Sequence, residues 1–299
     1  MKQILMALIA GVLVLGLAFV IGPRNYIAVA AAWLIGPSER SLGELLREVK
    51  ANKAALSIAE PSLERTEGGL DLWNTPQERI WTVHGDAILR FLMYEQARDV
   101  YQPPGHEIRN GDIVLDVGAN IGMFTRTALA RGASLVVAIE PAPQTLNAFR
   151  RNLEKEIREG RVVVYPKGAW DRDAEMELSI NESNQANDTL VLPRESSRTT
   201  IRVSLTTIDK IVAELKLPRV DFIKMDIEGA EKPAIKGAEN TIKRFRPRMS
   251  LSTEHLADDS AAIPALVHSI EPSYTHSGCD CVVEGRSLKA LVMVFDPVS

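Results

Sequence analysis

Two groups of residues in this 299-residue chain have the types and the spacing that ligand chemistry requires. In the first, the segment Asp116–Gly122 (DVGANIG) follows the apolar run IVL and precedes a helical stretch. Glycines at such a turn let the backbone come close to a ligand. The spacing GxNxG differs from the GxGxxG that holds a pyrophosphate at a helix N-terminus, so it favours a cofactor that does not need that helix end. Asp116 can accept a hydrogen bond from a cationic amino group.

The next apolar run ends in Glu140 and Pro141. An acidic residue at the tip of a second strand is placed to bind both hydroxyls of a ribose, as carboxylates do in dinucleotide-binding folds. A solvated acid at a strand end is the alternative for Glu140. Its distance from the DVGANIG segment favours the ribose role.

The second group lies at the ends of two later strands. The segment KMDIEGAE (residues 224–231) follows VDFI, and strand alternation puts Lys224 and Asp226 on the same side. The next run ends in Glu254 and His255. The ordinary imidazole pKa of about 6.5 makes His255 the candidate general base.

Glu228 and Glu231 have a competing structural role, because acids near the start of a helix cap it and interact favourably with its dipole. Asp226, Glu228, Glu254 and His255 could also gather a hard divalent cation. The histidines are scattered along the chain without a tight zinc pattern, and we expect a site without a metal.

Composition excludes some classes of protein and partner. The net charge of −4 gives no basic surface, so no nucleic-acid partner is expected. Cys279 and Cys281 are separated by one residue, a spacing that fits disulfide geometry poorly. With His276 they fall short of a structural zinc pattern and are expected to be ordinary thiols.

The N-terminus is hydrophobic. Residues Ile4–Ile21 contain no charged side chain and nearly match a bilayer core of about 30 Å, which predicts a transmembrane helix. A cleaved signal peptide is the alternative, since Ala28–Ala30 resembles a cleavage site. More lysines and arginines follow the apolar run than precede it, so the rest of the chain is expected in the cytoplasm.

These residues need a scaffold that brings strand ends together. From Asp112 onward, short β-branched runs alternate with helical stretches, the pattern of a parallel sheet covered by helices on both faces. The last two runs read as an antiparallel hairpin. Helical patterns at 38–59 and 86–100 flank a polar stretch at 60–76. We expect an anchor at 1–36, a helical extension and linker at 37–105, and an α/β domain at 106–299.

The motifs DVGANIG, IEP, KMDIEGAE and KGA together resemble the FkbM-type methyltransferases, over about residues 111–255. The resemblance implies a class I, Rossmann-like sheet, mostly parallel, with S-adenosylmethionine as the cofactor. It places Asp226 at the methyl-transfer end of the pocket, and Ala169 and Trp170 beside the adenine. A hydrophobic lid is the alternative for Trp170. The expected cofactor-binding residues are Asp116, Gly118, Asn120, Gly122, Glu140, Pro141, Ala169, Trp170 and Asp226.

The expected activity is methylation of a hydroxyl on a sugar, a lipid or a lipid-linked small molecule, by an enzyme attached to the membrane. Methyl transfer to oxygen requires removal of the hydroxyl proton and in-line placement of oxygen, carbon and sulfur. The expected catalytic residues are Lys224, Asp226, Glu228, Glu254 and His255. A membrane-tethered cofactor-binding or assembly protein without catalysis is the alternative. A nicotinamide-dependent oxidoreductase is disfavoured because the phosphate-binding glycine triad is absent.

Overall fold

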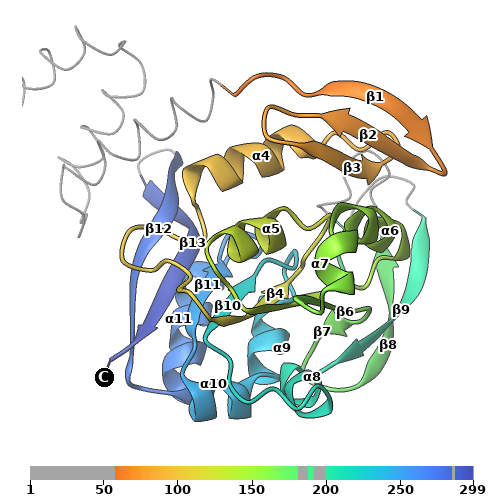
Figure 1. Cartoon of the computed structure of the whole chain (residues 1–299). Coiled ribbons are helices and arrows are strands. Elements are labelled where there is room, and N and C mark those ends of the chain that lie inside the picture. Colours follow the sequence, from red (N-terminus) through yellow and green to blue (C-terminus); the bar gives the residue numbers. More distant parts are fainter. Residues whose placement is uncertain (1–57, 181–187, 192–198, 285–286, 299) are drawn as a thin grey trace, which may run out of the picture.

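A central seven-stranded sheet organises the chain, in a computed structural model that describes residues 58–180, 188–191, 199–284 and 287–298. The strand order is β12-β13-β11-β10-β4-β5-β6 (Figure 1). The five parallel strands are β4 (Ile113–Val117), β5 (Leu135–Ile139), β6 (Val162–Tyr165), β10 (Phe222–Met225) and β11 (Arg248–Ser252). The antiparallel hairpin is β12 (Tyr274–Glu284) and β13 (Ser287–Pro297). The predicted α/β class, the mainly parallel sheet and the C-terminal hairpin are confirmed.

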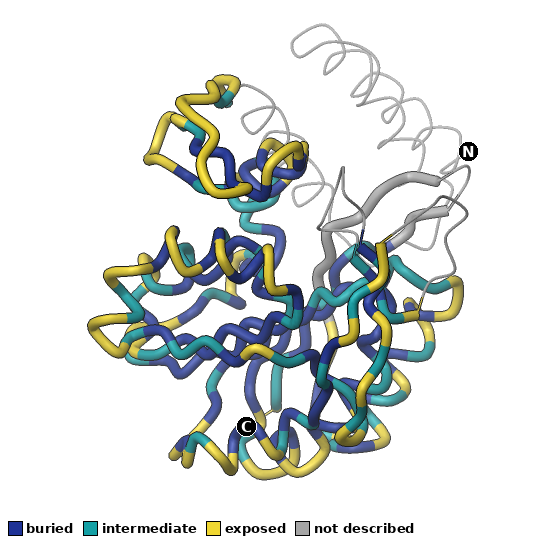
Figure 2. Tube along the Cα trace, turned by 90° about the vertical axis from the view of Figure 1, so that its right-hand side faces the viewer, coloured by how far each residue is buried: buried dark blue, intermediate teal, exposed yellow. Residues whose placement is uncertain are grey.

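Helices cover both faces of this sheet, as Figure 1 shows. One face carries α5 (Met123–Ala130), α6 (Pro143–Asn152) and α7 (Glu154–Arg158). The other carries α8 (Ile208–Glu214), α9 (Glu231–Lys236), α10 (Glu239–Phe245) and α11 (Asp259–Ile270). In Figure 2 the parallel strands of this sheet are largely buried, and most of the exposed residues around them lie on the outer surfaces of the helices and in loops.

Alternation along β4 assigns its side chains to the two faces. Leu115 and Val117 pack in the core between the sheet and helices α8 to α11. Val114 packs on the opposite face with Phe124 of α5. Asp116 therefore lies on the α5 side, the same side as Val114. The parallel register pairs Asp116 with Lys224 of β10. Two charged residues are thus brought together inside the sheet.

The segment before the main sheet folds differently from the expectation. Residues 60–76 were predicted as a polar linker, but they include the whole of two strands, β1 (Ser62–Glu67) and β2 (Leu70–Asn74). β3 (Arg79–Val83) completes a three-stranded antiparallel sheet, and α4 (Leu89–Arg98) follows it. The turn Gly68-Gly69 has positive φ at both residues, as a two-residue hairpin requires. The linker prediction was wrong, whereas the helix predicted at 86–100 is confirmed.

A third sheet, in the order β7-β9-β8, was not predicted. It consists of β7 (Gly168–Ala169), β8 (Ala174–Ser179) and β9 (Thr200–Thr206). It packs through a cluster that includes Ala142, Leu178 and Leu205. This sheet lies beside the carboxyl end of β5 and contributes walls to the pocket described below.

The predicted membrane anchor at residues 4–21 lies outside the described residues, as do positions 37–57 of the predicted extension. Among the residues that the structure describes, no helix is both long enough and apolar enough to cross a bilayer. The side chains of Cys279 and Cys281 also lie outside the description.

Asn152, at the end of α6, connects the N-terminal sheet to the turn formed by residues 116–122. Its Oδ1 accepts a hydrogen bond from the Trp81 backbone N–H (2.7 Å), and its Nδ2 donates to the carbonyls of Trp81 and Ile121 (2.9 Å each). The residue is buried, so these bonds have no water to replace them.

Replacing Asn152 by Ala should destabilise the protein by about 2–4 kcal/mol, because it removes three hydrogen bonds and leaves buried partners unsatisfied. The control is Asn74→Ala, at an exposed position on β2. Thermal or denaturant unfolding measures both. A loss for Asn152→Ala no larger than that for Asn74→Ala would show that this junction does not stabilise the fold.

Candidate active site

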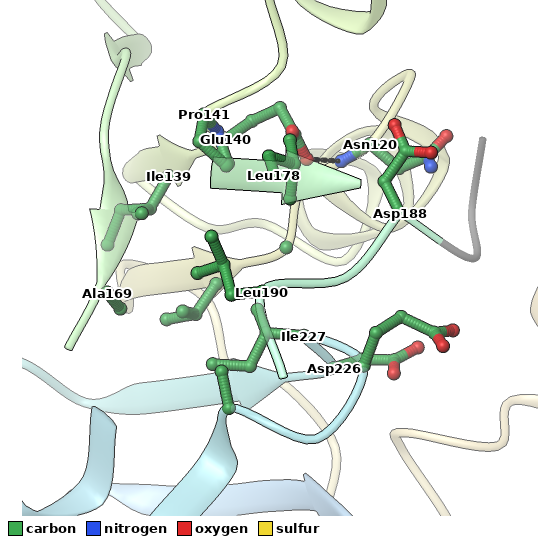
Figure 3. A pocket seen from close by; sticks show the side chains of 15 residues that line it. Asn120, Ile139, Glu140, Pro141, Ala169, Leu178, Asp188, Leu190, Asp226 and Ile227 are labelled. Carbon is green, nitrogen blue, oxygen red and sulfur yellow. Dashed lines mark hydrogen bonds between the residues drawn. The ribbon is translucent and has the colours of Figure 1, made fainter. Parts of the chain in front are cut away.

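A pocket opens at the carboxyl edge of the central sheet, where ligands bind in open α/β folds. It encloses about 570 Å³ of space that is partly open to solvent, within the size range of small-molecule sites. Figure 3 shows side chains from several segments directed into it. The lining residues are Val117, Gly118, Asn120, Ile139, Glu140, Pro141, Gly168, Ala169, Leu178, Asp188, Leu190, Asp226, Ile227, Glu228 and Ala230.

Gly118 is required by a close backbone contact. Its φ is +81°, and a Cβ at this position would lie 1.9 Å from the carbonyl oxygen of Asp226. The turn is also held to β5, because the N–H groups of Gly118 and Ala119 donate to the Ile139 carbonyl (3.0 and 3.2 Å). The glycine was expected to make room for a ligand; it also makes room for the end of β10.

Gly122 has a different role from the one expected. It precedes α5 with φ +93°, and a Cβ there would meet Leu153 at 2.6 Å and the Phe149 ring at 3.0 Å. It is not among the pocket-lining residues. Its lack of a side chain is explained by the packing of the loop against α6 and the residue that follows α6.

Glu140 is fixed by the backbone on both sides of the pocket. Its Oε2 accepts from the Asn120 N–H (3.1 Å) and its Oε1 from the Ala142 N–H (2.9 Å), as Figure 3 shows for Asn120. Burial raises the pKa of Glu140 to about 7, against the opposing effect of the two N–H donors. Each carboxylate oxygen can accept more than one hydrogen bond, so Glu140 retains acceptor capacity for a ligand.

Asp116 and Lys224 lie behind the pocket rather than on its wall. Asp116 is fully buried, and its Oδ2 accepts from the Thr125 hydroxyl (2.6 Å). Lys224 Nζ donates to the Gly118 carbonyl (2.7 Å) and lies 3.5 Å from Asp116 Oδ1. Burial alone would lower the pKa of Lys224, but the charges of Asp116 and Asp226 raise it overall, so the amine stays charged. The pair holds the ends of β4 and β10 together.

Asp226 is the centre of the second group of residues. Asp226 is one of the residues that line the pocket, and its Oδ2 accepts a hydrogen bond from the Tyr101 hydroxyl (2.7 Å). His255 Nε2 lies 3.6 Å from Asp226 Oδ1 and 3.5 Å from Glu228 Oε1, and His255 Nδ1 lies 3.2 Å from Glu231 Oε1. Strand ends that are distant in sequence thus converge, as the sequence predicted.

The electrostatic surroundings of His255 differ from the expectation. Burial alone would lower its pKa, but contacts with Glu228, Glu231 and Asp226 raise the pKa of His255 to about 11. The imidazole therefore carries a proton at neutral pH when no other cation is present. The assumption of an ordinary pKa near 6.5 was wrong, and with it the reason for choosing His255 as a general base.

Glu95 and Tyr101 were missed in the sequence. The Tyr101 hydroxyl lies 3.3 Å from Glu95 Oε1, and burial, followed by the charge of Asp226, raises the pKa of Glu95 to about 8. The sequence did carry one sign of this role. Glu95 follows the buried Leu92 of α4 by three residues, so the two side chains lie on the same face of the helix. Glu95 links the N-terminal segment to the Asp226 group.

Of the other residues predicted for the site, some line the pocket and others lie next to it. Pro141 and Ala169 line the pocket, whereas Trp170 does not and instead packs against the buried cluster containing Ala142 and Leu178. In this structure Trp170 is therefore a packing residue beside the pocket, neither in contact with the pocket space nor part of its wall. Glu254 lies outside the lining residues, close enough to affect the pKa of Glu95.

Asp188 and Leu190 were not predicted to line the pocket, and no motif marks them. Figure 3 shows Asp188 on the same side as Asn120. They reach the pocket through the segment that follows β8, which pairs back on it at Ser179 and Thr189.

Comparison with known proteins identifies a family. Residues 116–276, just over half of the chain, match the family model described as "Methyltransferase FkbM domain". The 31-O-demethyl-FK506 methyltransferase FkbM of Streptomyces tacrolimicus is 28% identical over 179 residues, covering 50% of this chain and 69% of that protein. The hexuronic acid methyltransferase AglP of Haloferax volcanii is 28% identical over 166 residues, covering 56% and 63% respectively.

Among solved structures, the chain is similar to the methyltransferase FkbM of Methylobacillus flagellatus, with a TM-score of 0.48 and 17% identity. That match covers 85% of this chain and 60% of the other. The chain thus spans roughly two thirds of the length of these relatives or less.

Replacing Gly118 by Ala should lower stability and abolish binding of the expected cofactor, because the new Cβ forces the Asp226 carbonyl away. Gly105→Ala is the matched control: its φ is also positive, +92°, but nothing lies within 4 Å of a Cβ there. Thermal unfolding and calorimetric titration with S-adenosylmethionine measure both effects. Equal behaviour of the two variants would disprove the importance of the contact between Gly118 and Asp226.

Proposed function

The chain belongs to the FkbM methyltransferase family, and on that premise we propose that it transfers a methyl group from S-adenosylmethionine to a hydroxyl oxygen of a sugar, a lipid or a lipid-linked small molecule. The observation that carries the proposal is the single pocket wall formed by Glu140, Gly118 and Asp226. Two relatives support the acceptor class, since their names specify 31-O-demethyl-FK506 and a hexuronic acid as the compounds methylated.

The cofactor has groups that fit the lining residues. Glu140, held by two backbone N–H donors, is placed to accept hydrogen bonds from the ribose hydroxyls. Ile139, Leu178 and Leu190 offer apolar contact for the adenine ring. The Asp226 carboxylate would attract the sulfonium cation and so define the methyl-transfer end. When bound, the cofactor supplies an activated methyl group.

The protein must also accommodate the proton that leaves the acceptor hydroxyl. His255 is protonated and cannot take it up, and the pKa of Asp226 is lowered chiefly by Lys224, against the effect of burial. Burial raises the pKa of Glu95 to about 8, so its ionised form, which accepts a proton, is the minor form at neutral pH and becomes available as the pH rises toward 8. We therefore assign proton acceptance to Glu95, with Tyr101 connecting it to Asp226.

Replacing Glu140 by Gln should weaken S-adenosylmethionine binding by about 1–3 kcal/mol, because charge-assisted hydrogen bonds are lost. In the wild type, affinity should rise as pH increases through about 7, since the ligand favours the ionised carboxylate and the proton is lost in this range. The variant should lack this dependence. Calorimetry at pH 6, 7 and 8 measures this dependence; equal affinity of both proteins at every pH would remove Glu140 from the cofactor site.

The same calorimetric titration with NAD in place of S-adenosylmethionine should show no binding to the wild type.

Replacing Glu95 by Gln should leave cofactor affinity nearly unchanged and reduce turnover by about 10²–10⁴-fold, the usual contribution of a general base. The exposed Glu154→Gln on α7 is the matched control. Turnover is measured as transfer of a radiolabelled methyl group to glycan and lipid extracts. Wild-type turnover in Glu95→Gln would remove it from the mechanism, and cofactor binding by the wild type without any transfer would favour the non-catalytic alternative.

A further inference from the structure

Three metal-ligating side chains converge at the pocket rim, where β10 and β11 end. Asp226, Glu228 and His255 each offer one ligand atom, and these atoms lie within 4.8 Å of one another. His255 Nε2 is 3.6 Å from an oxygen of Asp226 and 3.5 Å from an oxygen of Glu228. With metal–ligand bonds of about 2.1 Å, neighbouring ligand atoms are about 3.0 Å apart in octahedral and about 3.4 Å in tetrahedral geometry. A small inward movement of the side chains would complete such a site.

The orientation of the imidazole is a second, independent observation. His255 is nine-tenths buried, and its Nδ1 faces Glu231 Oε1 at 3.2 Å, which directs Nε2 toward the other two carboxylates. Glu231 is itself fixed, because it accepts the N–H groups of Ile227 (2.8 Å) and Gly229 (3.0 Å) and is 1% exposed. Metal-bound histidines almost always donate their other ring N–H to a carboxylate or carbonyl, and Glu231 is the carboxylate that lies nearest to the buried Nδ1, which has no hydrogen bond among the residues that the structure describes.

The local charge also favours a cation. Asp226, Glu228 and Glu231 surround one imidazole. The nearby amine of Lys224 is directed to Asp116 and the Gly118 carbonyl. A divalent cation would offset the excess negative charge more fully than a proton on His255 does.

We propose that Asp226, Glu228 and His255 bind a divalent cation and that Glu231 positions His255 for it. The two carboxylates are ligands that manganese(II) shares with magnesium and calcium, whereas the imidazole favours a first-row transition metal, so manganese(II) is the probe ion for this site. The expectation of a metal-free site is replaced by this proposal.

The proposal assigns a substrate class, and that part rests on the proposed function. Asp226 and Glu228 both line the pocket, so open coordination positions of the ion face the space where the acceptor binds. An ion there would hold two neighbouring oxygens of one acceptor, such as a vicinal diol or a hydroxy acid. It would also lower the pKa of the bound hydroxyl and orient its oxygen toward the methyl group. Acceptors with a single isolated hydroxyl should be poorer substrates.

The test is a titration of the chelator-treated, full-length chain with manganese(II). The electron paramagnetic resonance signal of the free ion measures how much manganese stays unbound at each step. The wild type should bind about one ion per chain. Glu228→Gln should weaken binding at least 10-fold, and Glu231→Gln about 10–100-fold, as expected for a group that orients a ligand. Glu239→Gln, an exposed acid on α10, is the matched control and should bind as the wild type does.

A second measurement does not depend on variants folding. Pulsed resonance spectra of the wild-type complex should show nitrogen coupling from one imidazole. Absence of manganese binding at millimolar concentration, absence of nitrogen coupling, or wild-type affinity in Glu228→Gln would each overturn the proposal. Calorimetry with S-adenosylmethionine on the same sample separates the two hypotheses. Cofactor binding without metal binding overturns only the metal site, and metal binding without cofactor binding overturns the proposed function instead.

Discussion

The contact between the Gly118 turn and the Asp226 backbone is the constraint on which the site depends. A single added carbon at Gly118 would lie 1.9 Å from the Asp226 carbonyl oxygen, so the ends of β4 and β10 can approach only if this position has no side chain. Lys224 reinforces the approach by bridging Asp116 and the Gly118 carbonyl. The turn at Gly118 and the segment at Asp226 therefore lie in direct contact at the carboxyl edge of the sheet.

Charge organises the other half of the site. Several carboxylates gather around Asp226, and one of them, Glu95, has a raised pKa because burial disfavours its ionised form. Burial raises the pKa of Glu140 elsewhere in the pocket in the same way. Protonation at Glu95 and a cation among Asp226, Glu228 and His255 are two ways to limit repulsion. Such perturbed groups in a cleft are typical of functional sites. In a merely structural strand end, burial of so many acids would be destabilising without compensation.

The features that could be predicted from the sequence are those set by interactions between residues close together in the chain. β-branched runs and the DVGANIG turn specify the parallel sheet and its ligand edge, because strand alternation and glycine geometry act over a few residues. The roles of Gly122 and Trp170 were misjudged because their partners, such as Phe149 and Leu178, are distant in sequence. Glu95 was missed because it lies in a helix that the sequence pattern assigns to an N-terminal extension, away from the predicted site. The pKa of His255 could not be predicted because it depends on three carboxylates that only the fold brings together.

The central claim is that one pocket at this edge binds S-adenosylmethionine between Glu140 and Asp226. A crystal structure with S-adenosylhomocysteine, the demethylated product, tests it most directly. The account predicts the ribose hydroxyl oxygens within about 2.5–3.0 Å of the Glu140 oxygens and the sulfur facing Asp226. A ligand bound elsewhere, or one whose ribose makes no contact with Glu140, would contradict it.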